Sequence, residues 1–171
     1  MKNSTQIFEM ALQINKPWHI TSATLTKSEL VVKLCELGMD IFSEKFTEDK
    51  FIKIISDYKN KMVGLLLIDQ HIISGIGNYL RADILYDAKI HPNTKINELS
   101  KDELKILYSS IKKITNKSYE QNGTNVETYI SGDYDPLVYG KKFDLYGNKV
   151  EKLLISGRSI YYVPKIQKLK K

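Results

Sequence analysis

The residues best suited to bind an anion lie in the stretch Gly75-Ile76-Gly77-Asn78, which runs directly into a helical pattern. Glycine adopts positive φ without a Cβ penalty, so the pair can reverse the chain sharply. Asn78 is then expected at the N-cap of the next helix, where free backbone N–H groups and a partial positive charge suit a phosphate oxygen. A purely structural turn would use the same atoms, and the spacing alone allows both interpretations.

Positive charge is concentrated at the C-terminal end of the chain. The 171 residues carry a formal net charge of +6, and residues 141–171 hold nine Lys or Arg against two acidic residues. The rest of the chain is therefore about neutral. A basic segment on a neutral body is the electrostatic footprint of a polyanion partner, most simply nucleic acid. A solvated lysine-rich tail would have the same composition, so this alternative stays open.

Several classes of protein are disfavoured by the composition. His19, His71 and His91 match no metal-ligand spacing, so we expect no metal and no other cofactor. Cys35 lies among apolar residues in a helical pattern without a nearby histidine, which predicts a buried structural thiol rather than a nucleophile. The longest apolar run, 62–68, is far shorter than the roughly 18 residues of a membrane span, and no secretory signal is visible. We expect an intracellular protein without a membrane partner.

The hydrophobic periodicity predicts a helical body followed by a β-hairpin. After a strand-like alternation over 8–14, the expected helices are one capped by Ser28 and running to Gly38, one over 51–62 that includes Tyr58, a short one over 65–69, one that carries Leu80 to Ala88, and one from Ser100 towards Gly123. The last starts with a capping box, Ser100-Lys101-Asp102-Glu103. Beyond Gly132 the period changes to two, Gly147-Asn148 marks a turn, and 159–163 is rich in β-formers. The fold class is mainly α with a small β-hairpin.

A longer pattern surrounds the glycine pair. The runs Leu66-Leu67-Ile68-Asp69-Gln70 and 75–86, with Ile90 and Pro92, resemble the helix-two-turn-helix signature of the formamidopyrimidine-DNA glycosylase and endonuclease VIII family. The sequence Asn78-Tyr79-Leu80-Arg81-Ala82 looks most like the endonuclease VIII-like branch. Asp83 stands where the family usually has glutamate, and Leu37-Gly38-Met39-Asp40 resembles the family's Leu-Gly-Pro-Asp link. The resemblance covers residues 37–168.

The C-terminal part resembles the finger of the same family, whose usual ending is Tyr-Tyr-Cys-Pro-x-Cys-Gln. The matching runs are Val138-Tyr139-Gly140-Lys141, Gly157-Arg158-Ser159 and Tyr161-Tyr162-Val163-Pro164-Lys165-Ile166-Gln167. The four positions of the metal-binding cysteines hold Phe143, Tyr146, Val163 and Ile166. The resemblance is therefore to the zincless finger, in which packing replaces the metal in holding the hairpin.

This resemblance implies three regions and a partner. Residues 1–36 would be a remnant of the N-terminal catalytic domain, 37–130 the helix-two-turn-helix DNA-binding domain, and 131–171 the zincless-finger hairpin with a basic tail. The family's N-terminal β-sandwich is then largely missing. The implied partner is double-stranded DNA that carries a damaged nucleotide.

The resemblance also implies the binding residues. In the family, the asparagine of the Gly-x-Gly-Asn turn and the arginine of the finger hold the phosphates that flank an everted nucleotide, and these are Asn78 and Arg158 here, with Gly75 and Gly77 shaping the turn. An amide donor and a forked guanidinium suit phosphate oxygens. Lys61, which precedes the Leu-Leu-x-Asp-Gln segment, and Lys141 of the finger complete the predicted DNA-binding set.

Three further side chains have two interpretations each. Arg81 is expected to make a contact on the helix surface, with phosphate binding as the alternative. Tyr161 and Tyr162 are expected to pack the hairpin, with stacking on bases as the alternative.

No catalytic residue is assigned. The family's nucleophile is an N-terminal proline followed by glutamate, whereas this sequence begins Met1-Lys2-Asn3 and has its prolines at positions 17, 92, 136 and 164. The sequence therefore predicts a DNA-binding module of a base-excision-repair glycosylase without competent catalysis alone. One alternative is an active glycosylase and abasic-site (AP) lyase, joined to or complemented by a separately encoded catalytic half. Another is an RNA-binding protein, since some ribosomal proteins carry a helix-two-turn-helix and a Gly-Ile-Gly turn.

Overall fold

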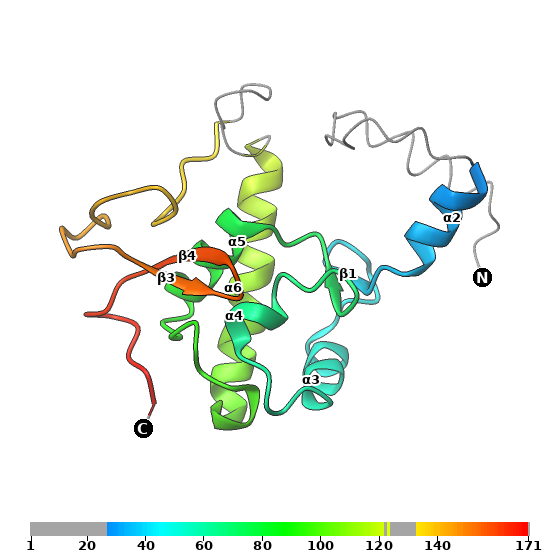
Figure 1. The fold of residues 1–171 in the computed structure, drawn as a ribbon, viewed down its shortest axis with the longest axis horizontal. Helices are drawn as coiled ribbons and strands as arrows, with labels where there is room; N and C mark the ends of the chain where they lie inside the picture. Colours follow the sequence, from blue (N-terminus) through cyan, green and yellow to red (C-terminus); the bar gives the residue numbers. More distant parts are fainter. Residues whose placement is uncertain (1–26, 122, 124–132, 171) are drawn as a thin grey trace. The chain divides into compact units, whose positions relative to one another are not determined.

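The computed structural model describes residues 27–121, 123 and 133–170 (Figure 1). The chain divides into two units, Met1–Leu37 and Gly38–Lys171. The predicted strand over 8–14 lies outside the described residues. Among the described residues, no helix is both long and apolar enough to cross a membrane.

The described part of the first unit is helix α2 (Lys27–Cys35), which differs from the prediction in three ways. It begins before Ser28, so Ser28 is not its cap, and it ends before Gly38. Cys35 is exposed, so the prediction of a buried thiol is wrong. Helical spacing identifies the helix, but it does not say which of its faces other elements cover.

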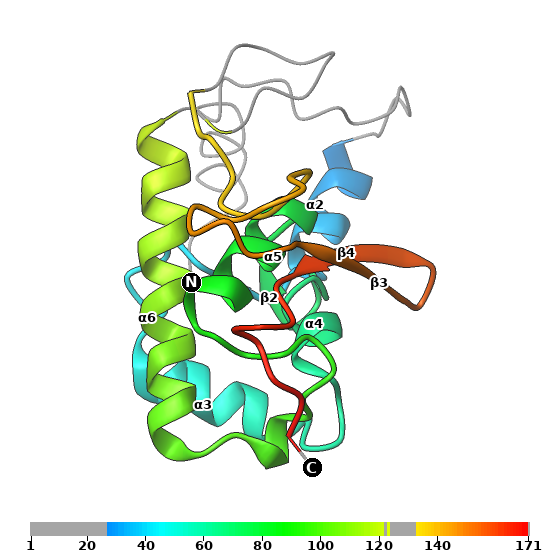
Figure 2. The ribbon, with the colours of Figure 1, turned by 90° about the vertical axis from the view of Figure 1, so that its left-hand side faces the viewer.

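The second unit begins with a helical body, which we define as residues 38–121. It contains α3 (Glu48–Ser56), α4 (Val63–Leu66), α5 (Asn78–Asp87), the short 3-10 helix η1 (Ile96–Glu98) and α6 (Lys101–Glu120). Two short strands, β1 (Met39–Asp40) and β2 (Ile73–Ser74), pair in parallel with Met39 opposite Ile73. Both α3 and α5 pack against the long helix α6 (Figure 2).

The helix starts follow from local side-chain chemistry. At α6 the predicted capping box is confirmed: the Ser100 hydroxyl accepts from Glu103 N at 3.2 Å, and the Glu103 carboxylate accepts from Ser100 N at 2.7 Å. At α3 the Thr47 hydroxyl accepts from Lys50 N at 3.4 Å. This helix ends at Ser56, so Tyr58 lies in the following turn and not in the helix as predicted.

The core of the helical body is apolar, and its residues recur at helical spacing along each helix. On α6 the buried side chains include Leu107, Ile111 and Ile114, three and four residues apart, and α3 contributes Phe51 and Ile55. All five are 0–1% exposed. The i, i+3 and i, i+4 pattern read from the sequence therefore gives the correct inward face of both helices.

Residues 133–170 form what we call the finger. Its strands β3 (Glu151–Ile155) and β4 (Arg158–Tyr162) are antiparallel, with Leu153 opposite Ile160. Ser156 and Gly157 join them with φ of 48° and 75°, the two left-handed residues of a tight hairpin turn. The predicted turn at Gly147-Asn148 lies just before β3, between the paired residues Phe143 and Lys149. The predicted fold class, mainly helical with a small hairpin, is confirmed.

The finger lies against α5, which is held between the hairpin on one side and α6 on the other (Figures 1 and 2). Asp83 of α5 is fully buried and accepts four hydrogen bonds from the first residues of the finger. The donors are the Tyr134 hydroxyl at 2.8 Å and the backbone N–H groups of Leu137, Val138 and Tyr139 at 2.8, 3.0 and 3.3 Å. One carboxylate thus fixes where the finger begins on the helical body.

At the metal-ligand positions of the family, packing holds one end of the finger and not the other. Val163 is 0% exposed and Ile166 packs against the core, whereas Phe143 and Tyr146 are 57% and 80% exposed. Within the described ranges, no group of three or more His, Cys, Asp or Glu side chains could hold a metal. We expected packing to replace the metal at all four positions. Apolar packing does so at Val163 and Ile166 but not at Phe143 and Tyr146.

Two polar side chains anchor these two ends. Asp144, next to Phe143, accepts from the Tyr86 hydroxyl at 3.0 Å and from the backbone N–H groups of Tyr146 and Asn148 at 2.9 and 2.7 Å. Gln167 is 1% exposed. Its carbonyl accepts from Val163 N, and its amide donates to Ile90 O, both at 2.8 Å. Polar anchors thus tie the finger to α5 and to the residues just after it.

The tyrosines of β4 pack within the fold. The ring centres of Tyr161 and Tyr139 are 4.9 Å apart, and the Lys152 ammonium lies 4.9 Å from the centre of the Tyr161 ring. Tyr162 is 9% exposed and meets His91 edge-on at 5.0 Å. These contacts agree with the packing interpretation of both rings.

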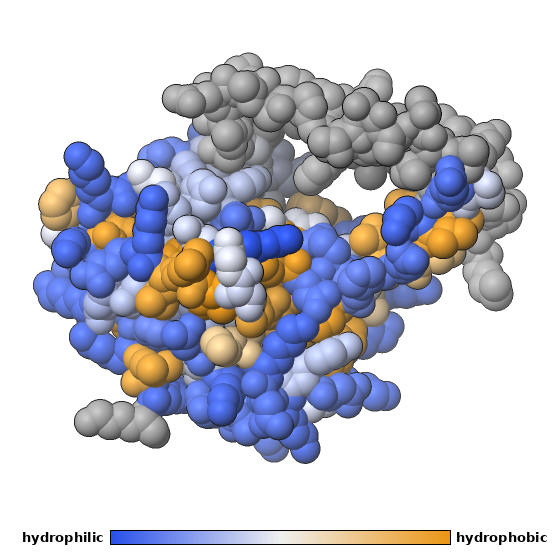
Figure 3. All heavy atoms as spheres, in the orientation of Figure 1, coloured by the Kyte–Doolittle hydropathy of each residue, from blue (hydrophilic) through white to orange (hydrophobic). Residues whose placement is uncertain are grey.

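The surface of the molecule mixes polar and apolar side chains. On the face shown in Figure 3, hydrophilic side chains surround separate apolar patches. Large exposed apolar side chains of the finger include Leu145 and Leu154, at 72% and 74%.

Candidate functional site

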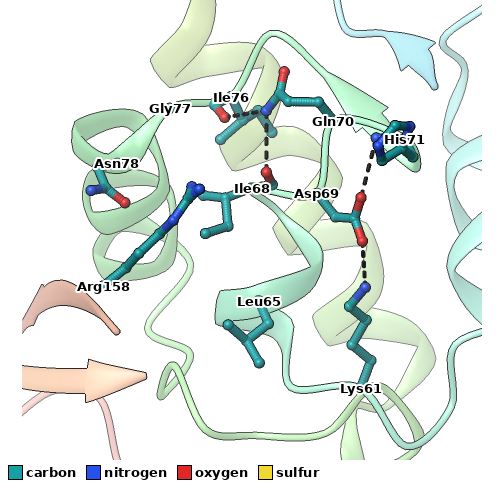
Figure 4. Close-up of a pocket in the computed structure, with 10 residues that line it drawn as sticks. All are labelled: Lys61, Leu65, Ile68, Asp69, Gln70, His71, Ile76, Gly77, Asn78 and Arg158. Carbon is teal, nitrogen blue, oxygen red and sulfur yellow. Dashed lines mark hydrogen bonds and ion pairs between the residues drawn. The ribbon is translucent and has the colours of Figure 1, made fainter. Parts of the chain in front are cut away.

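A groove of about 510 Å³ lies where the helical body meets the hairpin (Figure 4). It is lined by the Gly77-Asn78 turn, by Gln70 and Lys61 of the helical body, and by Arg158 at the start of β4. Arg158 extends from the strand into the groove, where it lies beside Asn78. The fold thus brings together two residues that are far apart in the sequence.

Glycine occupies positions 75 and 77 of the turn for different physical reasons. Gly75 has φ of +101°, so the backbone conformation favours glycine there, and a Cβ on it would lie 3.0 Å from the Ile41 side chain, which would have to shift. Gly77 has φ of −102° and is the N-cap of α5, and a Cβ on it would meet no atom of the described residues within 4 Å. Protein packing therefore does not require glycine at 77, whereas close approach of a ligand to the backbone is a reason for one.

Gln70 holds the turn in shape. Its carbonyl accepts from Gly75 N at 3.0 Å, and its amide donates to Ile76 O at 2.8 Å and to Ile68 O at 3.3 Å. Sequence reasoning named Gln70 only as part of a motif and did not predict that it braces the turn. The available signal was an amide, able both to donate and to accept, a few residues before a glycine turn.

Asn78 is the first residue of α5 and not its N-cap, so the predicted capping role is wrong by one position. Its side-chain oxygen accepts a hydrogen bond from Arg81 Nη2 at 2.8 Å instead. Within the described part of the chain, its Nδ2 group donates to no partner. The asparagine therefore offers donors to a ligand.

Arg158 is exposed, and its guanidinium makes no hydrogen bond or ion pair with any other described residue. A planar guanidinium with free donors can take two oxygens of one phosphate. Together with Asn78 and the start of α5, it gives the groove an array of donors suited to an oxyanion.

Arg81 is not on the helix surface, so that prediction is wrong. Its side chain is 0% exposed and donates from Nη1 to Gly64 O at 3.0 Å, and from Nη2 to Asn78 and to Ser159 O, the latter at 3.2 Å. Burial, and secondly the charge of Arg158, lower the pKa of Arg81 to about 10, so it stays protonated at neutral pH. Charged residues are assigned to the outer face of a helix by default, and the contacts that bury this one come from distant segments.

The two predicted lysines lie in different places. Lys61 lines the groove and pairs with Asp69, with its Nζ 2.5 Å from the carboxylate. The hydrogen bond from Lys61 lowers the pKa of Asp69 below its usual range, although burial opposes this. Lys141 pairs with Asp135 at 2.8 Å and does not line the groove. Their binding roles stay predictions.

Comparison with known proteins agrees with this architecture. Residues 37–129 match the family model described as the formamidopyrimidine-DNA glycosylase H2TH domain. A formamidopyrimidine-DNA glycosylase of Arabidopsis thaliana is 35% identical over 141 residues, covering 81% of this chain and 36% of that protein. One from Cytobacillus firmus is 28% identical over 149 residues, covering 81% and 54%. The chain thus spans about half the length, or less, of these curated relatives.

Solved structures share the fold. The complex between Lactococcus lactis Fpg and an abasic-site-containing DNA matches with a TM-score of 0.75 at 24% identity, covering 85% of this chain and 57% of that one. MutM in complex with carbocyclic 8-oxo-G containing DNA matches with a TM-score of 0.73 at 26% identity, covering 84% and 56%.

Proposed function

Because the chain belongs to the formamidopyrimidine-DNA glycosylase family through its H2TH domain, we propose that it binds the backbone of duplex DNA through Asn78 and Arg158. We call these two residues the phosphate clamp. The observation that carries the proposal is that both line one groove, from different elements, with donors that no other described residue uses. The DNA in the solved structures of the relatives supports the choice of ligand.

The clamp matches the chemistry of a phosphate. Arg158 supplies a forked pair of donors, and Asn78 supplies an amide donor at a helix start. The basic residues of 141–171 add attraction that does not depend on sequence. Lys61 and Lys141 contribute less in this proposal, because each must exchange an existing carboxylate partner for a phosphate.

We further propose that the bound duplex carries a damaged nucleotide and that excision of the base depends on a catalytic half, joined or separately encoded. The proposal is supported by the share of the relatives' length that this chain spans. It predicts little covalent trapping of an abasic-site duplex by borohydride, and a strong adduct at stoichiometric protein would contradict it.

Membership of the endonuclease VIII-like branch is also proposed, on the sequence from Asn78 to Ala82. An intracellular location stays a prediction.

The test is the salt dependence of duplex binding by wild type and Arg158→Ala, measured by fluorescence anisotropy. The variant should bind more weakly at every salt concentration, and the slope of log K against log salt should be shallower by about one. An unchanged slope would contradict the clamp.

A matched control is Lys149→Ala in the same finger, whose ammonium pairs with Glu151 and which does not line the groove. It should lose less affinity than Arg158→Ala, whereas equal losses would indicate general attraction by the basic segment. Competition with a structured RNA of similar length tests the RNA-binding alternative, because preferential release of the DNA by RNA would favour that class.

A further inference from the structure

Arg81 joins the elements that build the groove. Its guanidinium donates to Gly64 O in α4, to Asn78 Oδ1 in α5 and to Ser159 O in β4. Asn78 is one half of the phosphate clamp, and Ser159 follows Arg158, the other half. One buried side chain thus contacts both sides of the clamp.

The charge of Arg81 has no counter-charge in the described part of the chain. Its three acceptors among the described residues are neutral, two backbone carbonyls and one amide, and its Nε has no hydrogen-bond partner among those residues. No carboxylate of the described residues forms an ion pair with it. A buried cation without an anion is costly, because desolvation removes the water that would stabilise it. Its lowered pKa, about 10, agrees with this, and the guanidinium nevertheless stays charged at neutral pH.

We propose that Arg81 is a positioning residue of the phosphate clamp, whose buried positive charge takes the bound phosphate as its counter-ion. This inference rests on the proposed binding of DNA phosphates. Arg81 orients the clamp without touching the ligand, and it differs in this from Arg158.

Arg81 sets the orientation of the Asn78 side-chain amide by donating to its oxygen. An asparagine amide has one end that accepts and one that donates, and Arg81 occupies the accepting end. The donating end is then the one left for the ligand. Without Arg81 the amide could turn, and its oxygen would repel a phosphate. The hydrogen bond to Ser159 O holds the start of β4, and hence Arg158, at the same groove.

The first test changes the charge of Arg81. Arg81→Gln, which is neutral, should lose about tenfold or more in duplex affinity and make the salt slope shallower by about one. Arg81→Lys keeps the charge with a poorer hydrogen-bond geometry, so it should bind more weakly than wild type but keep the wild-type slope. A purely structural role would give both variants the same slope, and that result would overturn the proposal.

The second test keeps Arg81 and so does not depend on the folding of its variants. Asn78→Asp places a carboxylate where the amide oxygen now lies, 2.8 Å from Arg81 Nη2, and so supplies the missing counter-charge. The Tm of this variant should rise by about 3 °C while duplex affinity falls at least about tenfold. An unchanged or lower Tm would overturn the proposal.

The two proposals fail in different ways. If wild type and Arg158→Ala bind duplex alike, the proposed function fails, whatever the Tm of Asn78→Asp. If Arg158→Ala weakens binding but Arg81→Gln keeps the wild-type affinity and slope, only the role of Arg81 fails.

Discussion

The helical body and the finger are stabilised in different ways, although they form one unit. In the body, α6 presents Leu107, Ile111 and Ile114 to the core, and each is at most 1% exposed. The finger also buries apolar side chains, such as Ile160 and Val163, but single polar residues tie it to the body.

Three such polar residues are Asp83, Asp144 and Gln167, and each makes hydrogen bonds that bridge the finger to the helical body. Apolar packing is non-directional, so by itself it specifies the position of one element on another less sharply than directional hydrogen bonds do. Hydrogen bonds to one buried carboxylate or amide fix a position. The place of Arg158 in the groove therefore depends on these few polar contacts as well as on the hydrophobic core.

The largest effect is expected for Asp83→Asn. An asparagine cannot accept all four hydrogen bonds of the carboxylate, and its NH2 group would face backbone N–H donors. We expect a loss of about 2–4 kcal/mol in the free energy of unfolding, with loss of duplex binding as the finger detaches. Chemical denaturation and anisotropy measure the two effects. Asp135→Asn is the control, because the Asp135 carboxylate is 78% exposed. If Asp83→Asn lost no more stability than Asp135→Asn, the role of Asp83 would be refuted.

The next effect is expected for Gln167→Ala. The substitution leaves Ile90 O and Val163 N without their buried partner, which should cost about 1–3 kcal/mol in the free energy of unfolding. Amide hydrogen exchange should show faster exchange at Val163 N than in wild type. Unchanged stability and exchange would mean that apolar packing alone holds the end of the finger.

The contribution of Asp144 to the free energy of unfolding should depend on pH. Burial raises the pKa of its carboxyl, but hydrogen bonds from Asn148, Tyr86 and Tyr146 outweigh burial and lower that pKa below its usual value. For a carboxyl whose pKa is lower in the folded state, the stabilisation is present above the unfolded pKa, near 3.9, and is lost as the pH falls through the folded value. Asp144→Asn should therefore cost about 1–2 kcal/mol at pH 7.

This cost should shrink below about pH 4 as wild type loses the contribution of its carboxylate. Denaturant unfolding of both proteins between pH 7 and pH 3 measures the difference. A difference that stays constant over this range would contradict the anchoring role of the charged carboxylate.

The smallest effect is expected at Phe143 and Tyr146, although both occupy metal-ligand positions of the family. Their side chains are largely exposed, so replacing each by Ser should change the free energy of unfolding by only about 0.5 kcal/mol or less. Val163→Ala is the matched comparison at a buried position and should cost about 2 kcal/mol. Equal costs at exposed and buried positions would show that packing holds both ends of the finger.

The sequence predicted the parts of this molecule that depend on periodicity and local chemistry. The main helices of the body, the capping box at Ser100 and the small hairpin follow from the spacing of apolar residues and from side chains close in sequence. The lining of one groove by Asn78 and Arg158 followed from the resemblance to a family and not from spacing.

The contacts that depend on residues distant in sequence were missed. Arg81 is buried by carbonyl groups from α4 and β4, and Asp83 by donors more than fifty positions away. Periodicity reports which face of a helix is apolar, so a charged residue that faces inward looks like a surface residue. Cys35 shows the converse, because its apolar neighbours do not ensure that another element covers it.

The phosphate clamp is tested most directly by following the side-chain signals of Asn78 Nδ2 and Arg158 Nε in nitrogen-15 NMR spectra during titration with duplex DNA. We expect both signals to shift together, with one titration curve, and we expect Arg158→Ala to weaken the response of Asn78. Shifts confined to the lysine-rich residues 165–171, with both clamp signals unmoved, would contradict it.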